Sequence, residues 1–380
     1  MALERWIDKC YSLRKNIIRK EKGVNKYLLA NFSGTSQQKD IEKRTALIGN
    51  YCRVKINVKA FDEKEMLKQN KPVMDFTNYS KVSDALRDEF DMPQWAHLKL
   101  MNHPLKDFTN TFISQLKGCN IHCPWCYVDD INKNGEKGNG EFFSIKEIVD
   151  LFEEERTKQP LYMIRPSGGE PTLAIEQWSE TLKEIKKRGL EKEVYVQADT
   201  NLTTGHFIDY LEKEGITEKN LLKKISKFDN FGILCSFKGT DTESFLQATG
   251  MTKKDGSPNM NFAFLEKERW YTFSKFVEAG LDAYPFIYDA NPDTIENFME
   301  EGARRFGEGF YLKTRIFNLK LYGPEKERFA KIGKNPEEQQ KRLDDNFEKS
   351  YNILNDFIQK KLGVPYGAIP RTGIKLEVKD

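Results

Sequence analysis

Strand-like and helix-like segments alternate through the middle of this chain, from about residue 106 to about residue 320. Short runs of apolar, β-branched and aromatic residues are each followed by a longer segment with apolar residues at helical spacing. The expected strands cover residues 108–116, 161–164, 193–197, 232–236, 281–288 and 310–317. Six such repeats predict an α/β fold with a parallel sheet and right-handed crossovers. The pattern fits an open, curved barrel of six units and also a doubly wound sheet.

Helices are expected between these strands, and two of them carry clear end signals. Ser144 and Glu147 stand in capping-box positions at the start of the helix expected over 144–158. Gly280 follows the apolar pattern of the helix expected over 262–279, as a C-terminal cap does. The remaining expected helices cover residues 174–187, 205–227 and 294–306.

The alternating core is flanked by two extensions, so the predicted division is 1–105, 106–320 and 321–380. The N-terminal extension is expected to hold a helix over 3–20 and a strand over 51–58. Eight Lys or Arg against three acids fall within residues 1–26, which fits a solvated helix face or a contact for an anionic partner. In the C-terminal extension, Asn335 and Pro336 open a helix that Gly363 closes. Residues 374–378 alternate like an edge strand.

Composition is that of an ordinary soluble chain. The 380 residues are 38% hydrophobic and 31% charged, and the net charge of +3 gives no global argument for nucleic acid or membrane binding. The first residues lack the apolar run of a signal peptide, and no run reaches the roughly 18–20 apolar residues of a membrane span. A cytoplasmic location is therefore expected.

Three of the six cysteines fall within eight residues, directly after the first expected strand of the core. Cys119, Cys123 and Cys126 form this group, and thiolates are the preferred ligands of iron–sulfur clusters. A structural zinc site needs four protein ligands, whereas a site with three keeps one coordination position open. Two alternatives remain at this point: a zinc site completed by His122 or His103, and a chance grouping of structural cysteines.

The spacing Cys-x3-Cys-x2-Cys, with Trp125 just before the last cysteine, resembles the signature of the radical S-adenosylmethionine (radical SAM) superfamily. A second stretch, Ser-Gly-Gly-Glu-Pro at 167–171, ends the next expected strand and is similar to that family's GGEP motif. Ligand groups gather at this rim of a parallel sheet. The resemblance implies a partial (β/α)6 barrel with N-terminal and C-terminal extensions, covering residues of about 106–320.

The same resemblance implies two cofactors and a set of residues that hold them. A four-iron four-sulfur cluster is bound by the three cysteines, and S-adenosylmethionine binds its open iron. The chemistry implied is reductive cleavage to a 5′-deoxyadenosyl radical, which abstracts hydrogen from a substrate. The residues implied in cofactor binding on these two motifs are Trp125, Gly168, Gly169, Glu170 and Pro171.

Two further segments are similar to the activases of glycyl-radical enzymes. Asp-Thr-Asn at 199–201 follows the third expected strand, and Leu-Cys-Ser-Phe-Lys at 234–238 ends the fourth and is followed by Thr-Gly at 249–250. Ser236 stands where the activases carry an aspartate, while Lys238 is retained. The resemblance adds Asp199, Asn201, Ser236 and Lys238 to the cofactor-binding candidates, and it identifies no catalytic side chain.

The predicted function is hydrogen abstraction from a protein or peptide substrate by a radical SAM enzyme that works under anaerobic conditions. A reducing partner such as flavodoxin or ferredoxin is implied, and no membrane partner. One alternative is modification of RNA or a small metabolite, with the basic N-terminal helix contacting phosphates. The other is a non-enzymatic metal-binding protein that holds an iron–sulfur cluster or zinc.

Overall fold

Six parallel strands form the centre of the fold. The computed structural model describes residues 2–39, 45–55, 110–366 and 373–379. The central strands are β5 (Thr111–Leu116), β7 (Met163–Gly168), β8 (Tyr195–Thr200), β9 (Phe231–Lys238), β10 (Ala283–Tyr288) and β11 (Arg315–Phe317). They pair in this order, each parallel to its neighbour. The predicted parallel sheet is confirmed.

The sheet stays open, because β5 and β11 do not pair with each other. Beyond β5 the pairing turns antiparallel, through β4 (Cys52–Lys55) and, at its last residue, β2 (Val24–Leu29). Three more strands complete the eleven of the described sheet: β1 (Ile18–Glu21), β3 (Thr45–Ile48) and β6 (Glu141–Ser144). An open array of six β-α units with additions at both chain ends is the predicted partial barrel, and that prediction is confirmed.

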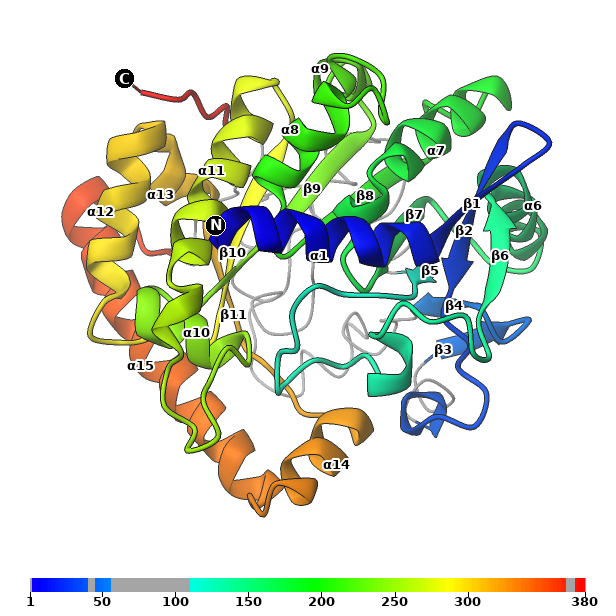
Figure 1. Ribbon diagram of the computed structural model, residues 1–380. Coiled ribbons are helices and arrows are strands. Elements are labelled where there is room, and N and C mark those ends of the chain that lie inside the picture. Colours follow the sequence, from blue (N-terminus) through cyan, green and yellow to red (C-terminus); the bar gives the residue numbers. More distant parts are fainter. Residues whose placement is uncertain (1, 40–44, 56–109, 367–372, 380) are drawn as a thin grey trace.

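Helices cover the outer face of this sheet (Figure 1). Those between the parallel strands are α6 (Ile145–Arg156), α7 (Glu176–Lys187), α8 (Gly205–Lys213), α9 (Leu221–Ile225), α10 (Thr242–Ala248), α11 (Phe264–Glu278) and α12 (Ile295–Phe306). The capping box of α6 is present, since the Ser144 side chain accepts from the Glu147 backbone and Glu147 accepts from the Ser144 backbone. Short 3-10 turns lie at η3 (Asp130–Asn132), η4 (Pro171–Ala174) and η5 (Met260–Phe262).

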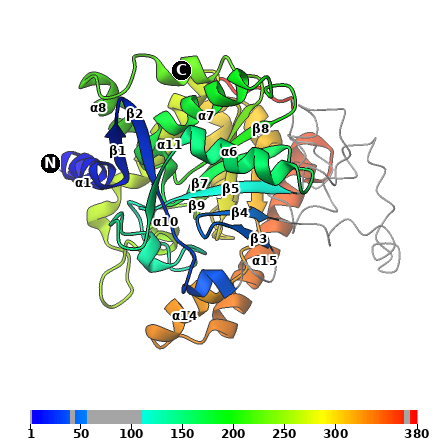
Figure 2. The same ribbon diagram turned by 90° about the vertical axis from the view of Figure 1, so that its right-hand side faces the viewer.

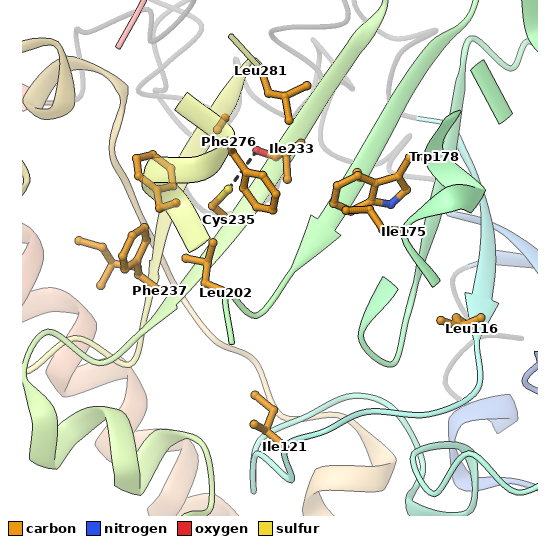
Figure 3. Packing of buried hydrophobic residues seen from close by; sticks show 14 of the residues in the cluster. Leu116, Ile121, Ile175, Trp178, Leu202, Ile233, Cys235, Phe237, Phe276 and Leu281 are labelled. Atoms are coloured by element: carbon orange, nitrogen blue, oxygen red, sulfur yellow. Dashed lines mark hydrogen bonds between the residues drawn. The ribbon is translucent and has the colours of Figure 1, made fainter. Parts of the chain in front are cut away.

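The two faces of the parallel strands bury different residues. In β9, Ile233, Cys235 and Phe237 point to the helices, where they join the main hydrophobic core (Figure 3). The alternate residue Leu234 belongs to a small second cluster, with Met163, Tyr195, Tyr284 and Phe286. Because successive strand residues point to opposite faces, this second cluster marks the inner face of the open barrel. The side chains that alternate with the main core therefore point inward.

The first helix lies across the front of the barrel in Figure 1 and beside β1 and β2 in Figure 2. Helix α1 (Ala2–Ile17) ends three residues earlier than predicted, because residues 18–21 pair with 24–27 in the hairpin of β1 and β2. Its Trp6 Nε1 donates to the Thr203 carbonyl at 2.7 Å, and Arg14 bonds to Leu173 O at 2.9 Å. Helix α1 is thus fixed to the loops that follow β7 and β8.

The C-terminal region holds α13 (Gly309–Lys313), α14 (Gly323–Lys331) and α15 (Pro336–Leu362). Asn335 caps α15, and Gly363 ends it with φ +72° as expected. The strand predicted over 310–317 is wrong for its first half, which is α13. A short apolar run does not separate strand from helix, and here Phe310 packs on the Cα of Gly302.

The edge strand predicted over 374–378 is also wrong, since the described residues there have no strand assignment. Ile374 and Leu376 instead approach Gly309, and the Ile374 carbonyl accepts from Lys313 Nζ at 2.9 Å. Packing against α13, and not strand pairing, produces the alternation. Over the residues that the structure describes, no helix is long and apolar enough to span a membrane.

Candidate functional site

The carboxyl ends of the central strands meet along one rim, because the strands are parallel. The loop after β5 carries the three grouped cysteines, and the turn after β7 carries the two glycines. Asp199 and Asn201 lie at the end of β8, and Lys238 ends β9. Sequence segments up to about 120 residues apart are thereby brought to one edge of the sheet.

The cysteine loop is folded back on itself. Gly118 N donates to Asn132 O at 3.1 Å and Cys119 N to Lys133 O at 2.9 Å, so the loop closes over residues 118–133. Inside it, Cys126 N donates to Cys123 O at 3.2 Å. Cys123 is buried, while Cys119 and Cys126 are half-buried, and all described cysteines are free. The loop therefore presents three thiols from one compact turn.

Electrostatics indicate that the three sulfurs lie near one another. Burial raises the pKa of the Cys119 thiol, and charge on Glu170, Cys123 and Cys126 raises it further. Among the described residues no group of three His, Cys, Asp or Glu surrounds a single metal ion. An iron–sulfur cluster attaches each cysteine to a different iron, so it needs a wider arrangement than one zinc ion does. His122 is exposed, and His103 lies outside the described residues.

The turn at 168–171 docks on the start of the cysteine loop. Gly169 N donates to Leu116 O and Glu170 N to Gly118 O, both at 2.8 Å. A Cβ at Gly169 would lie 1.7 Å from Gly118 O, and Gly168 has φ +106° with a Cβ position 2.6 Å from Leu116 N. Only glycine permits this approach of two backbones. The two motifs predicted from the sequence are one structural unit.

Glu170 fixes that unit to the loop after β8. Its side chain is about 1% exposed; Oε1 accepts from Thr172 N at 3.1 Å and Thr172 Oγ1 at 2.5 Å, and Oε2 accepts from Asn201 N at 2.6 Å. Burial raises the pKa of Glu170, and these hydrogen bonds lower it. Pro171 opens η4, where its missing N–H costs nothing.

Asn201 completes a polar corner, which we define as Cys119, Asn120, Glu170, Asn201 and Thr203. Asn201 Nδ2 donates to Asn120 Oδ1 at 2.8 Å and lies 3.8 Å from Cys119 Sγ. Its Oδ1 accepts from Thr203 N at 3.0 Å and Thr203 Oγ1 at 2.6 Å. Asn201 does not cap α8, which begins after Thr204. It connects a cysteine sulfur to the β8 loop.

Asp199 points into the barrel and pairs with Arg165 of β7. Arg165 Nε and Nη2 donate to its two carboxylate oxygens at 2.7 Å and 2.8 Å. Both side chains are largely buried, at 12% and 15% exposure. Asp199 therefore lies on the inner face beside the site, and its carboxylate is already engaged by a cation.

Lys238 lies on the opposite side of the rim, in an aromatic side that we define as Trp125, Lys238, Tyr288 and Phe317. Lys238 Nζ is 4.8 Å from the Trp125 ring centroid and 5.1 Å from that of Tyr288. The two rings stack at 5.9 Å with an interplanar angle of 14°, and Phe317 lies 5.1 Å from Tyr288. Ser236 is half-buried on the same strand as Lys238.

Several residues of the site were missed by sequence reasoning. Arg165 could have been predicted from the sequence, because it is a charged residue between apolar residues in a strand. Asn120 and Tyr288 carry none beyond their place at strand ends. Arg328, which contacts the cysteine loop from α14, carries none at all.

Comparison with known proteins identifies the superfamily of this chain. The model of the radical SAM superfamily matches residues 113–302, which is half of the chain, so the chain belongs to that superfamily. Among solved structures, one titled "Structure of TYW1 with a lysine-pyruvate adduct bound" is 14% identical, covers 81% of this chain and 88% of its own, and has a TM-score of 0.35. A search of curated proteins finds no significant match.

The protein is therefore a radical SAM enzyme, and its cofactors are a four-iron four-sulfur cluster and S-adenosylmethionine. The described residues around the cysteine loop fit these groups. Three thiols on one loop suit a cluster that keeps one iron free for a second ligand. The buried Trp125 Nε1 finds no hydrogen-bond partner within the described residues, which leaves a donor beside the cysteines.

Proposed function

We propose that Cys119, Cys123 and Cys126 bind the cluster and that the turn at 168–171 binds S-adenosylmethionine beside it. The observation that supports this most strongly is the contact of Gly169 with Gly118. It holds the turn directly against the residue before Cys119. A cofactor bridging the free iron and this turn would have its two anchors at a fixed separation, so little ordering is needed on binding.

Within the proposal, the chain's own residues bind and orient. Gly168 and Gly169 let the turn pack against the start of the cysteine loop, while Glu170 holds the turn and the β8 loop in register and would accept a hydrogen bond from the cofactor's ammonium. Asn201 orients Cys119, and Asp199 with Arg165 lines the inner wall. When bound, the cluster and cofactor supply a reductive cleavage that yields a hydrogen-abstracting radical.

Trp125, Ser236 and Lys238 are proposed to close the opposite side of the cofactor pocket. Trp125 is 6% exposed and Lys238 9%, so this wall is largely dry. A wall that excludes water protects a reactive radical. The Lys238 cation in this wall would favour a ligand carboxylate beside it.

For the substrate we propose a protein or peptide, in the manner of the activases that the segments at 199–201 and 234–238 resemble. The alternative of RNA relied on the basic N-terminal helix. Two of its cations are engaged inside the protein: Arg14 pairs with Glu176, and Lys9 Nζ donates to Asn120 O at 2.8 Å. Their engagement leaves fewer cations of this helix for phosphates, so the proposal relies on the resemblance of the two segments.

The proposal includes a low-potential reducing partner such as flavodoxin or ferredoxin, and an anaerobic, cytoplasmic setting. It also keeps the division into a core of residues 106–320 and two extensions. The described cysteines are all free thiols, which is consistent with a reducing compartment.

The test begins with protein purified without oxygen, which should hold about four irons and four sulfides per chain. Reduced and supplied with S-adenosylmethionine, it should release 5′-deoxyadenosine. Substrate class is then read by isotope transfer, using separate protein, RNA and small-molecule fractions of fully deuterated cells. Deuterium in 5′-deoxyadenosine is expected with the protein fraction alone; transfer from the RNA or small-molecule fraction would overturn the substrate assignment.

A further inference from the structure

Arg328 reaches the cysteine loop from outside the region that the superfamily model matches. It lies on α14, and its Nη1 donates to Pro124 O at 2.7 Å and Cys126 O at 3.0 Å. Its Nη2 donates to Val128 O at 2.9 Å, and its Nε to Asp130 Oδ1 at 3.0 Å. One guanidinium thus holds four points of the loop that carries Cys123 and Cys126.

Helix α14 is itself fixed by contacts outside the cysteine loop, so Arg328 extends to the loop from an anchored helix. Phe329 is buried, and Glu325 accepts from Tyr322 N at 3.2 Å at the start of the helix. The segment before it is tied to α15, since Leu321 N donates to Gln340 Oε1 at 2.7 Å and Gln340 Nε2 to Leu319 O at 3.0 Å. Figure 2 shows α14 below the barrel, at the end of this connection.

The chemistry of the contact is specific to arginine. A planar guanidinium offers five donors in a rigid fork, whereas a lysine ammonium is a flexible point charge. Three backbone carbonyls of one tight loop converge on that fork, so the loop's path from 124 to 128 is set by the side chain. Arg328 is 13% exposed on its side chain, and solvent screens its charge only in part.

The charge of Arg328 also acts on the sulfur ligands. Arg328 Nη1 lies 3.0 Å from the carbonyl oxygen of Cys126 and 2.7 Å from that of Pro124, the residue after Cys123, so the cation lies beside two of the three proposed ligands. Asp130 pairs with both Lys133 and Arg328, but its side chain is 57% exposed while that of Arg328 is 13% exposed, so solvent screens the carboxylate more than the guanidinium. A cluster on three thiolates gains one further negative charge on reduction, and nearby positive charge favours the reduced form.

We propose that Arg328 is a positioning residue for the cluster: it fixes the backbone of the cysteine loop and its charge raises the cluster's reduction potential. The inference depends on the proposed cluster ligands. It gives the C-terminal extension a function in the reaction, namely to make reduction by an external one-electron donor easier.

The experiment compares Arg328→Met, Arg328→Lys and the control Lys331→Met with the unchanged enzyme. Lys331 lies on the same helix and is exposed, so the control removes an equal charge away from the loop. Reduction potentials are measured by anaerobic titration followed by electron paramagnetic resonance. Amide hydrogen exchange over residues 119–133 is measured on cluster-free protein, which needs no cofactor.

Arg328→Met should shift the reduction equilibrium about tenfold toward the oxidised form, which is about 59 mV for one electron. Arg328→Lys should leave the potential nearly unchanged but speed loop exchange about tenfold, because hydrogen bonds worth roughly 1.4 kcal/mol are lost while the charge stays. The control should match the unchanged enzyme in both readouts.

A potential in Arg328→Met equal to that of the control would overturn the charge effect. Exchange in Arg328→Lys equal to the unchanged enzyme would overturn the positioning effect. If Arg328→Met retains no cluster, Arg328→Lys decides the question alone. Faster loop exchange at an unchanged reduction potential would support the proposal, and loop exchange equal to that of the unchanged enzyme would overturn it. A complete lack of cluster in the unchanged enzyme would instead refute the proposed function.

Discussion

The polar corner and the aromatic side of the rim are built in opposite ways. In the polar corner, Glu170 and Asn201 accept or donate at nearly every polar atom, and directly beside it the backbones of Gly118 and Gly169 touch. On the aromatic side, Lys238 is bounded by the rings of Trp125 and Tyr288. Directional hydrogen bonds specify one geometry, whereas ring contacts tolerate adjustment.

The difference teaches which side can accommodate a variable ligand. Each residue of the polar corner contacts another residue of the corner. A substitution there therefore disturbs the contacts that hold the cysteine loop. The aromatic side is joined to that loop through Trp125 alone among the contacts described here. We therefore expect variants of the polar corner to lose stability together with cofactor affinity, and variants of the aromatic side to keep both the cluster and most of the stability.

The largest effect is expected from Cys123→Ala. One of three proposed ligands is lost, so the iron content of anaerobically purified protein should fall from about four per chain to near zero. Cys235→Ala is the matched control, because Cys235 is a buried thiol on β9 that faces the helices. Iron and sulfide analysis measures both; a full cluster in Cys123→Ala would refute the ligand assignment.

Gly169→Ala should have the next largest effect. Its Cβ would lie 1.7 Å from Gly118 O, so the turn and the cysteine loop must separate. We expect a loss of about 1–3 kcal/mol in unfolding free energy, together with weak cofactor binding. Gly189→Ala is the control: it has φ +73° and no neighbour within 4 Å, so it should lose stability by roughly 1–2 kcal/mol with normal cofactor binding. Denaturant unfolding and equilibrium dialysis distinguish the two.

Glu170→Ala should leave the cluster in place while weakening cofactor affinity. It also frees the donors of Thr172 and Asn201 N, at a cost of about 1–3 kcal/mol. Thermal melting and dialysis should be run on the same preparations. Lower stability with unchanged cofactor affinity would limit Glu170 to bracing the two loops and remove it from the cofactor contacts.

Lys238→Met should have the smallest effect on stability. A cation over two rings contributes about 0.5–2 kcal/mol, and methionine keeps most of the side-chain volume. Cluster content should stay at the level of the exposed control Lys253→Met, while 5′-deoxyadenosine formation falls. Loss of the cluster in Lys238→Met would show that the two sides of the rim are not independent, and the comparison would fail.

Periodicity predicted the central architecture because apolar alternation and helical spacing are local properties of the chain. The capping box at Ser144 and the end of α15 at Gly363 were predicted for the same reason. The apolar run at 310–317 was misassigned because Phe310 and Tyr311 are buried equally well by a helix. The hairpin of β1 and β2 was missed because residues 19–22, in its first strand and turn, are all charged and show no apolar alternation, while the two strands pair through the backbone.

The sequence by itself indicated the superfamily: three cysteines in eight residues and a diglycine turn after the next strand resemble its motifs, and the family model over residues 113–302 confirms the membership. Tertiary structure alone decided which groups act together. It placed Gly169 against Gly118, paired Asp199 with Arg165, and brought Arg328 from the far end of the chain onto the cysteine loop. Such contacts depend on how strands and helices pack over long separations, and the side chains that make them leave no local pattern.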